Sequence, residues 1–401
     1  MIRIRSIIGL TLSALVWAVP ASAQTQIKIG VLTDMSGPYS DSTGNGSVVA
    51  ARLAVEDFEP QEHGMTVEVI SADHQNKPDI GAAIARRWID EDGVDVIADV
   101  PTSSVALAVN EIVRTKNKIL LVSGSVSSDL TGKACSPNTV QWTLDTWAVG
   151  NAIARAMVAH GDDSWFFLTA DYAYGKVAQA DTADAVARAG GHVVGSVRTP
   201  FPSFDFSSYL IQAQQSGAKA VVFASAGEDT VNEIKQAAEY GLRENHQTLV
   251  ALLMLDNEIH SLGLDVTQGL VFAAPGYWDL NEGTRAFSKR FAALDKGQMP
   301  NIVQMGVYGS VLHYLKAAAA VGAKDPARVM AEMKATPTDD PLFGKGAVRR
   351  DGRAIHPMYL LQVKAPSESK GPWDLLRVVD TIPADKAFRP LAEGGCPLVG
   401  K

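Results

Sequence analysis

Three hydroxyl-bearing residues stand where a strand pattern gives way to a helix pattern. Thr102, Ser103 and Ser104 follow the apolar run 94–100 and precede a helical repeat of apolar residues that begins at Val105. The free N–H groups of a helix N-terminus, together with the helix dipole, favour an anion such as a carboxylate. Simple N-capping by Ser103 or Ser104 would explain the same residues. The two roles can coexist, so this segment is a candidate anion-binding site.

A second polar loop, 123–128, follows the apolar run 119–122. Ligands of open α/β sheets bind where such loops leave the carboxyl ends of strands, so the two loops are expected at one edge. The loop lacks the G-x-G-x-x-G of a dinucleotide site, and the chain has no G-x-S-x-G, P-loop, H-E-x-x-H or C-x-x-C. Its eight histidines show no metal-ligand spacing. These observations favour a binding protein over an enzyme and predict neither a cofactor nor a metal.

Strands and helices alternate along the chain, and this alternation must position both loops. The stretch Ile27–Phe58 is typical of a strand, a polar loop and an amphipathic helix. The pattern restarts around Trp142–Gly150, and the part from Phe343 to Val379 is typical of short strands. The alternation predicts an α/β fold with parallel central sheets and helices on both faces. Further strands are expected at 65–71, 94–100, 119–122, 165–169, 193–197, 220–224, 249–254 and 270–273.

The length of 401 residues suggests about two domains. A hydrophobic content of 46% and a charged content of 20% are ordinary for a soluble globular protein. The net charge of −8 and the lack of a basic cluster with interleaved aromatic residues argue against nucleic acid as a partner. No low-complexity linker separates the halves, so we expect two lobes joined by a short multi-strand hinge.

Residues 1–23 are predicted to be a secretory signal peptide. Arg3 and Arg5 form a positive n-region, Ile7–Val19 is apolar, and Ala21-Ser22-Ala23 is a small-residue cleavage site. A membrane anchor is the alternative, but the apolar run is short for a membrane span. We therefore expect export to the periplasm with cleavage after Ala23, and no membrane insertion afterwards.

Cys135 and Cys396 are the two cysteines of the chain. An even number in an exported chain suggests a disulfide, with two unpaired thiols as the alternative. A bridge between them would close a very long loop, which is worth on the order of 5 kcal/mol in the chain-entropy model.

Six segments, in order, carry a resemblance to a known family: IKIGVLTDMSGPYSDSTG, PTSSVALAV, LLVSGS, DYAYGK, FDFSSYL and AVVFASAGEDT. Together they resemble the periplasmic solute-binding proteins of branched-chain amino-acid-type ABC transporters, the type I periplasmic binding proteins of the leucine-binding-protein family. The resemblance implies two flavodoxin-like lobes with a three-segment hinge, a ligand in the cleft, closure by hinge bending, and presentation to a membrane permease with its ATPase. It implies lobe 1 at 26–145 plus 275–338, lobe 2 at 146–274 plus 339–385, and a tail at 386–401. A monomer is expected.

The resemblance also assigns roles to individual residues. Hydroxyls that bind the ligand carboxylate fall at Thr102 to Ser104, and further contacts fall in the neighbouring loop at Ser123, Gly124, Ser125 and Ser127. Tyr174 is expected to pack over the ligand, and Tyr172 is a further candidate. Ala226 and Gly227 stand where relatives often carry an aromatic residue, which would leave room for a bulkier ligand. Tyr39, Tyr277 and Trp278 are candidate aromatic walls, although each alone is typical of ordinary packing.

The chain departs from the family pattern after Leu249. Amino-acid binders of the family place an acid beyond this strand to bind the α-ammonium, whereas here apolar residues continue until Asp256, with Glu258 next. If neither acid enters the cleft, a buried ammonium would lack its counter-ion. This departure favours a small carboxylate without an α-amine, such as an aromatic acid. The alternative ligand is a branched-chain or other amino acid, or an amide. Two alternative functions from other classes are a ligand-sensing receptor domain and a hydrolase.

Overall fold

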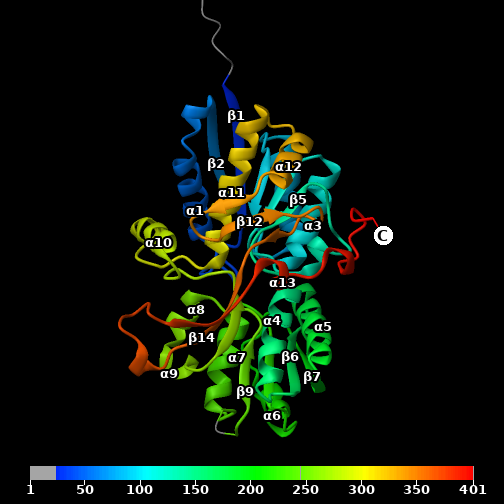
Figure 1. Cartoon of the computed structure of the whole chain (residues 1–401), viewed down its shortest axis with the longest axis vertical. Helices are drawn as coiled ribbons and strands as arrows, with labels where there is room; N and C mark the ends of the chain where they lie inside the picture. Colours follow the sequence, from blue (N-terminus) through cyan, green and yellow to red (C-terminus); the bar gives the residue numbers. More distant parts are fainter. Residues whose placement is uncertain (1–23, 244, 401) are drawn as a thin grey trace, which may run out of the picture.

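The computed structural model describes residues 24–243 and 245–400, so the predicted signal peptide lies outside the described residues. Two lobes are stacked along the long axis of the molecule, with crossing segments between them (Figure 1). Each lobe is built around a parallel sheet. The predicted α/β class with two flavodoxin-like lobes is therefore confirmed. No helix within the described ranges is long and apolar enough to cross a membrane.

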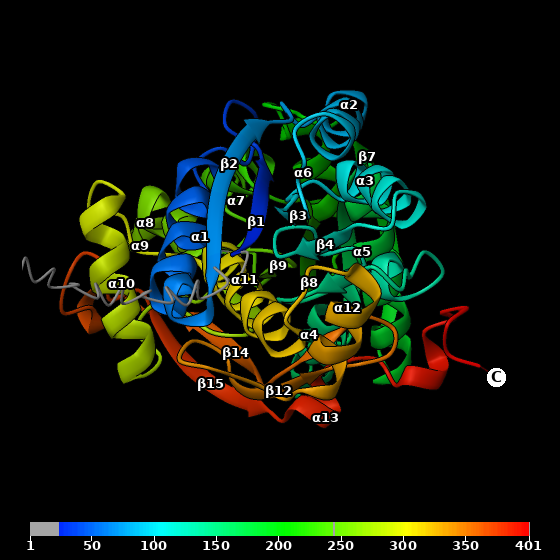
Figure 2. The same ribbon diagram turned by 90° about the horizontal axis from the view of Figure 1, so that it is seen from above.

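The first lobe contains a five-stranded parallel sheet in the order β2-β1-β3-β4-β5. Figure 2 shows α1 and α11 on one face of this sheet, and α2 and α3 on the other. The strands are β1 (Thr25–Thr33), β2 (Met65–Asp73), β3 (Val96–Asp99), β4 (Ile119–Val122) and β5 (Thr139–Gln141). The helices are α1 (Gly44–Phe58), α2 (Pro78–Asp90), α3 (Ser103–Thr115), α10 (Glu282–Leu294), α11 (Ile302–Val321) and α12 (Pro326–Ala335).

Strand β1 shows why this sheet is covered on both sides. Ile29 and Val31 belong to the hydrophobic cluster of α1 and α11, whereas Leu32 packs in the cluster of α2 and α3. Successive side chains of a strand point to opposite faces, so the near-continuous apolar run fills two cores. Gly30 faces the second core, because a Cβ there would stand 2.5 Å from the ring of Trp88.

The second lobe repeats the strand order of the first as β7-β6-β8-β9-β10, and two antiparallel strands extend its edge. This is the doubly wound order of flavodoxin-like sheets. The strands are β6 (Ser164–Ala170), β7 (His192–Thr199), β8 (Ala220–Ala224), β9 (Thr248–Ala251), β10 (Val271–Ala274), β14 (Met358–Val363) and β15 (Leu376–Ile382). The helices are α4 (Thr146–Ala159), α5 (Ala173–Arg188), α6 (Ser207–Gln215), α7 (Glu228–Glu239), α8 (Asp256–Leu262) and α9 (Leu264–Thr267).

The chain crosses between the lobes after β5, after β10 and before β14. The first and third crossings are bonded side by side: a ring nitrogen of His356 lies 2.8 Å from the carbonyl oxygen of Trp142. The buried guanidinium of Arg353 donates to the carbonyl of Thr143 at 2.7 Å and lies 3.6 Å from the carboxylate of Asp145. These contacts join the first and third crossing segments to each other.

A small antiparallel sheet precedes the third crossing and corrects one expected boundary. It consists of β11 (Thr338–Asp340), β12 (Gly344–Val348) and β13 (Ala354–Ile355). Leu342, Phe343 and Val348 are buried in the hydrophobic cluster of the first lobe, although the sequence assigned 339 onwards to the second. The apolar side chains of this turn fill space beside α12, so the crossing follows the small sheet. The other expected bounds of the lobes stay predictions.

The C-terminal tail returns to the first lobe after the short helix α13 (Ala384–Ala387). Its end lies beside the first lobe in Figure 1. The structure contains the expected disulfide between Cys135 and Cys396, with Cα atoms 5.6 Å apart. Arg389 also donates to the carbonyl of Ser128 at 3.2 Å. The tail thus adds a fourth covalent connection across the hinge.

Candidate functional site

A cavity lies between the lobes where the loops after their parallel strands meet. Its volume of about 20 Å³ has room for about one water molecule, so the lobes are closed. The first lobe contributes Tyr39, Ser42, Thr43, Pro101, Gly124, Val126 and Val303. The second lobe contributes Tyr172, Ala226, Gly227, Leu253, Leu255 and Glu258.

Aromatic rings from both lobes close one side of this cavity. The hydroxyl oxygens of Tyr39 and Tyr172 lie 2.5 Å apart across the cleft. Phe201 stacks on Tyr172 with ring centroids 4.0 Å apart, and burial raises the pKa of the Tyr39 phenol above its ordinary value. Tyr39 and Tyr172 therefore form one wall of the cavity.

The loop after β1 holds Tyr39 in this position. The buried carboxylate of Asp34 accepts from the backbone N–H of Gly37 at 2.7 Å and of Tyr39 at 3.1 Å. A Cβ on Gly37 would stand 2.6 Å from that carboxylate, so a glycine is required for the close approach. The polar run that separates the first strand from the first helix is thus a rigid support for an aromatic side chain.

Gly227 brings the second lobe against the same loop. It has a φ of +64°, and a Cβ there would stand 2.6 Å from the carbonyl oxygen of Pro38 and 2.9 Å from the ring of Tyr39. With Ala226 it lines the cavity. The two small residues permit the lobes to close over Tyr39. The sequence pattern alone had suggested only that their small size leaves room for a bulkier ligand.

The anion-binding candidate, Thr102 to Ser104, lies at the N-terminus of α3 beside the cavity. The turn before it is strained, because Asp99 and Val100 have φ values of +80° and +53°. This turn brings Pro101 into the cavity wall. Ser103 is buried and Ser104 is half-buried, and none of the three hydroxyl residues lines the small closed cavity.

The hydroxyls of this segment are engaged elsewhere, whereas its backbone donors are not capped. Thr102 donates to the side-chain oxygen of Asn76 at 2.6 Å, and Ser103 accepts from Ser125 at 3.1 Å. No side chain caps the helix at its N-cap residue, Thr102. The capping explanation for these residues is therefore wrong, and the first N–H groups of α3 remain available to an anion.

The neighbouring serine loop reaches the cavity through its backbone and its apolar residue. Gly124 and Val126 line the cavity, and the sequence had not singled out Val126. Ser123 lies with its hydroxyl 3.5 Å from the carboxylate of Asp99, and Ser127 caps a 3₁₀ turn by accepting from Asp129 N at 3.4 Å. The serine side chains thus hold the loop together.

Three predicted aromatic contacts lie outside the cavity in this closed form. Tyr174 is buried behind Tyr172, and its hydroxyl has no hydrogen-bond partner among the residues that the structure describes. Tyr277 packs half-buried against the core of the second lobe. Trp278 donates its indole N–H to the carbonyl of Trp373 at 3.0 Å. The latter two residues belong to the second crossing and to its support.

An acid does enter the cleft, and it is Glu258. Its side chain accepts from the backbone N–H of Leu255 at 2.8 Å and lies 3.4 Å from the hydroxyl of Ser42 in the other lobe. Burial raises the pKa of Glu258 from 4.5 to about 7. Asp256 is also buried, with its pKa raised to about 7 for the same reason, but it does not line the cavity.

The sequence pattern did not show that Glu258 enters the cleft, because β9 is shorter than the apolar run that predicted it. A strand was expected over 249–254, but β9 ends at Ala251 and the chain turns into a loop before α8. Leu253 and Leu255 therefore line the cavity from a loop, and Glu258 follows in the first turn of α8. Glu258 forms only the carboxylate half of a capping box, by accepting from the backbone N–H of Leu255, because the leucine side chain has no acceptor to complete it.

Comparison with known proteins identifies the class that this geometry defines. The chain belongs to the periplasmic binding protein family, whose model matches residues 26–372. The structure matches a crystal structure of a periplasmic binding protein from Burkholderia mallei with a TM-score of 0.90; the two are 45% identical, over 94% of this chain and 100% of that one. A branched-chain amino acid ABC transporter periplasmic ligand-binding protein from Burkholderia xenovorans matches with a TM-score of 0.84 and 41% identity, over 93% and 100% of the two chains.

The matches to curated relatives extend over a smaller part of the chain. The Leu/Ile/Val-binding protein homolog 6 of Brucella melitensis is 28% identical over 256 residues, which is 61% of this chain. The match spans 63% of the length of that relative. The family expected from the ordered segments is confirmed by these comparisons.

Among the described residues, no group of three or more His, Cys, Asp or Glu side chains could hold a metal ion.

Proposed function

We propose that this chain is the extracytoplasmic solute-binding component of an ABC importer. It captures a small solute between its lobes in the periplasm, as a monomer, and presents the closed form to a permease with its ATPase. Family membership, the hinge of bonded crossing segments and the contacts between Tyr39, Tyr172 and Gly227 support this role. A ligand that binds the closed form better than the open form shifts the population toward closure. No catalysis is proposed.

The cavity of about 20 Å³ is too small for such a solute, so the lobes must stand further apart around a ligand than they do in this closed form. The ligand class that the lining supports best is a small apolar α-amino acid. The observation that carries this proposal is Glu258, a carboxyl group in a cavity that is otherwise lined mostly by apolar side chains. A ligand ammonium would supply its counter-ion. The uncapped N-terminus of α3 would receive the ligand carboxylate on the opposite lobe. The reason to disfavour an α-amine, namely a cleft without an acid, no longer holds.

An aromatic acid without an amine is the second candidate. The rings of Tyr39 and Tyr172 favour it, because aromatic side chains pack well against a planar ligand. In this case a protonated Glu258 would line the cavity as a neutral group, which its raised pKa allows.

Calorimetric titration with matched ligand pairs separates the two candidates. Leucine is compared with 4-methylpentanoate, and phenylalanine with 3-phenylpropionate, so that each pair differs only by the α-amine. We expect the amino acid of a pair to bind at least tenfold more tightly, since a hydrogen bond between charged groups is worth about 1.5–3 kcal/mol. Tighter binding of the amine-free acids would favour the second candidate, and binding of none of these or of other carboxylates would refute the proposed ligand class.

The pH dependence of the affinity is an independent test of the ligand class. An ammonium requires ionised Glu258, whose pKa is about 7 in the closed form. The affinity for an amino acid should therefore rise as the pH is increased from about 5 to about 7 and then level off. The affinity for an amine-free acid should fall over the same range, because the ionised carboxyl repels it. Glu258→Gln should flatten both profiles.

A further inference from the structure

The end of the chain runs from one lobe to the other beside the hinge. It leaves the second lobe after β15, which pairs with β14, and passes through α13 between the lobes (Figure 1). It is bonded to the first lobe at Cys396, through the disulfide to Cys135. Asn110 of α3 donates to the carbonyl of Ala134 at 2.9 Å, so the loop that carries Cys135 is fixed to that lobe. We call residues 384–396 the strap.

Phe388 of the strap lies against the two side chains that bond the third crossing to the first. Its ring centroid is 4.6 Å from the guanidinium carbon of Arg353 and 5.3 Å from the ring centroid of His356. Arg353 donates to the carbonyl of Thr143, and His356 contacts the carbonyl oxygen of Trp142. Phe388, Arg353 and His356 are all buried. The strap therefore covers the bonds that join these crossing segments.

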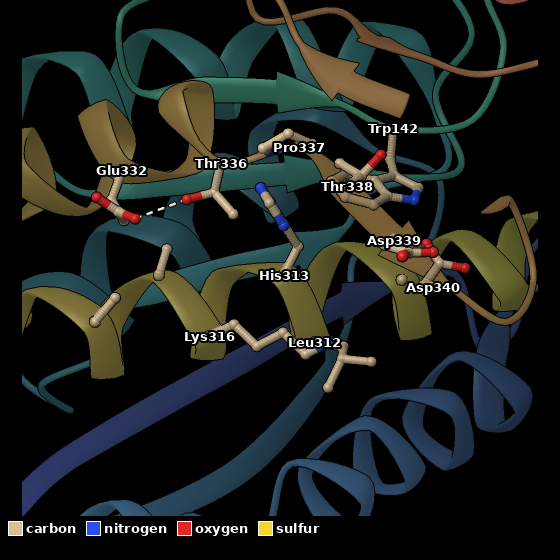
Figure 3. A pocket seen from close by; sticks show the side chains of 13 residues that line it. Trp142, Leu312, His313, Lys316, Glu332, Thr336, Pro337, Thr338, Asp339 and Asp340 are labelled. Atoms are coloured by element: carbon tan, nitrogen blue, oxygen red, sulfur yellow. Dashed lines mark hydrogen bonds between the residues drawn. The ribbon is translucent and has the colours of Figure 1, made fainter. Parts of the chain in front are cut away.

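The first crossing is also packed into the first lobe. Trp142 lies against His313 of α11, with ring centroids 5.5 Å apart (Figure 3). Both side chains line a cavity of about 260 Å³ between α11, α12 and β11. The crossing segments are thus held by contacts with the first lobe as well as with the strap.

The cover by Phe388 matters because Arg353 is a buried charge. Its guanidinium lies 3.6 Å from the carboxylate of Asp145, and burial lowers the pKa of Arg353 to about 10. An aromatic face over a desolvated guanidinium adds a cation–π attraction. Burial also lowers the pKa of His356 to about 4, so its ring is neutral at pH 7. Water that reached these groups would compete for the hydrogen bonds between the crossing segments, so loss of the cover would loosen the hinge.

The strap meets both lobes at Ser128. Arg389 donates to the carbonyl of Ser128 at 3.2 Å, and Arg349 donates to the carbonyl of Arg389 at 2.7 Å. The hydroxyl of Ser128 donates to the carboxylate of Asp181, in α5 of the second lobe, at 2.6 Å. The strap thus supports a loop of the first lobe at the point where the second lobe bonds to it.

The disulfide by itself places little restriction on the lobes. Residues 384–396 would reach on the order of 40 Å if fully extended, because each residue spans about 3.3–3.6 Å. A limit on lobe movement must therefore come from the docked side chains of Phe388 and Arg389. The disulfide keeps the strap near its docking site and so raises its effective concentration there.

We propose that the strap limits how far the lobes open. Opening turns one lobe against the other about the crossing segments, and the two ends of the strap belong to different lobes. A wide opening has to remove Phe388 from the hinge or Arg389 from Ser128, so the docked strap opposes it. This inference rests on the proposed opening and closing of the lobes, but not on the identity of the solute.

The distance between spin labels on the two lobes tests this proposal in the ligand-free protein. The labels are attached at Asp79→Cys and Lys176→Cys, which are exposed positions at the starts of α2 and α5. Electron–electron double resonance then gives the distribution of distances between the lobes. Phe388→Ala uncovers the hinge, and the pair Cys135→Ser with Cys396→Ser frees the strap. Both changes should extend the distribution to distances longer by several ångströms.

Two further variants separate docking from the mere presence of the strap. Phe388→Leu keeps an apolar cover and should restore most of the wild-type distribution. Leu398→Ala is the matched control, because Leu398 is 42% exposed and lies beyond the disulfide, and it should change nothing.

The same distribution in all five proteins, or a shift to shorter distances, would overturn the proposal. A shift in Leu398→Ala as large as that in Phe388→Ala would also contradict it. If the cysteine variant fails to fold, Phe388→Ala and Phe388→Leu still decide the question. Because no ligand is added, a negative result here would leave the proposed ligand class untouched.

Discussion

Glu258 is a carboxyl group that the closed structure buries between the lobes, in contact with a hydroxyl of the opposite lobe. Its role differs from that of the hydroxyls that drew attention in the sequence. Ser103, Ser125 and Thr102 bond to side chains within their own lobe, and their effect is to hold the backbone N–H groups of α3 in place. Residue types alone indicate that polar chemistry exists at this edge, but which atoms face a ligand depends on pairings that only the folded loops reveal.

Glu258→Gln should raise the thermal midpoint of the ligand-free protein at pH 8 and change it little at pH 5. The folded protein keeps a proton on Glu258 up to a pH of about 7, whereas the unfolded chain loses it near 4.5, so stability is lost as the pH rises between these values. The loss is on the order of 3 kcal/mol, and glutamine avoids it while preserving the capping bond.

The check is a pair of thermal melts at each pH. Glu239→Gln, at an exposed position, serves as the matched control and should shift the midpoint equally little at both pH values. A gain for Glu258→Gln at pH 5 as large as that at pH 8 would show that Glu258 is not buried with a raised pKa.

At the scale of elements, the sequence pattern predicted the type and order of the strands and helices well. The run 119–122 coincides with β4, because a short apolar stretch between turns has one reasonable interpretation. The end of β9 was missed, since the apolar residues beyond Ala251 continue into the core of the second lobe and the cavity wall from a loop and not from a strand. Contacts between distant segments, such as Gly227 on the loop of Tyr39, are not visible in local periodicity.

Gly227→Ala should weaken ligand binding at least tenfold. The added Cβ would stand 2.6 Å from the carbonyl of Pro38, a contact that exists only when the lobes are closed. Gly217→Ala is the control, because Gly217 has a similar φ of +65° with no atom within 4 Å of the added carbon. Calorimetry on both variants separates loss of closure from backbone strain, and similar affinities would argue against a closure contact at Gly227.

At the scale of the whole molecule, two lobes of the same strand order face each other across bonded crossing segments. The tail adds a disulfide that joins residues 261 positions apart. The pairing could be expected from two cysteines in a chain with a predicted signal peptide, whereas the course of the tail over the hinge to Ser128 could not, because few apolar residues mark it.

Reduction of the disulfide should lower the thermal midpoint by several degrees. Opening a loop of this length costs on the order of 5 kcal/mol in the chain-entropy model. The measurement is a thermal melt with and without reductant. The double variant Cys135→Ser with Cys396→Ser should melt like the reduced protein under both conditions. A wild-type midpoint that is unchanged after complete reduction would contradict this expectation.

The most direct measurement is a crystal structure of the chain with the tightest ligand from the matched-pair titrations. We expect electron density beside Glu258, with the hydroxyls of Tyr39 and Tyr172 further apart than the 2.5 Å of the closed form described above, a ligand carboxylate at the N-terminus of α3 and an ammonium at Glu258. Density for that ligand outside the cleft, or in the cleft with no contact to either group, would contradict the proposal.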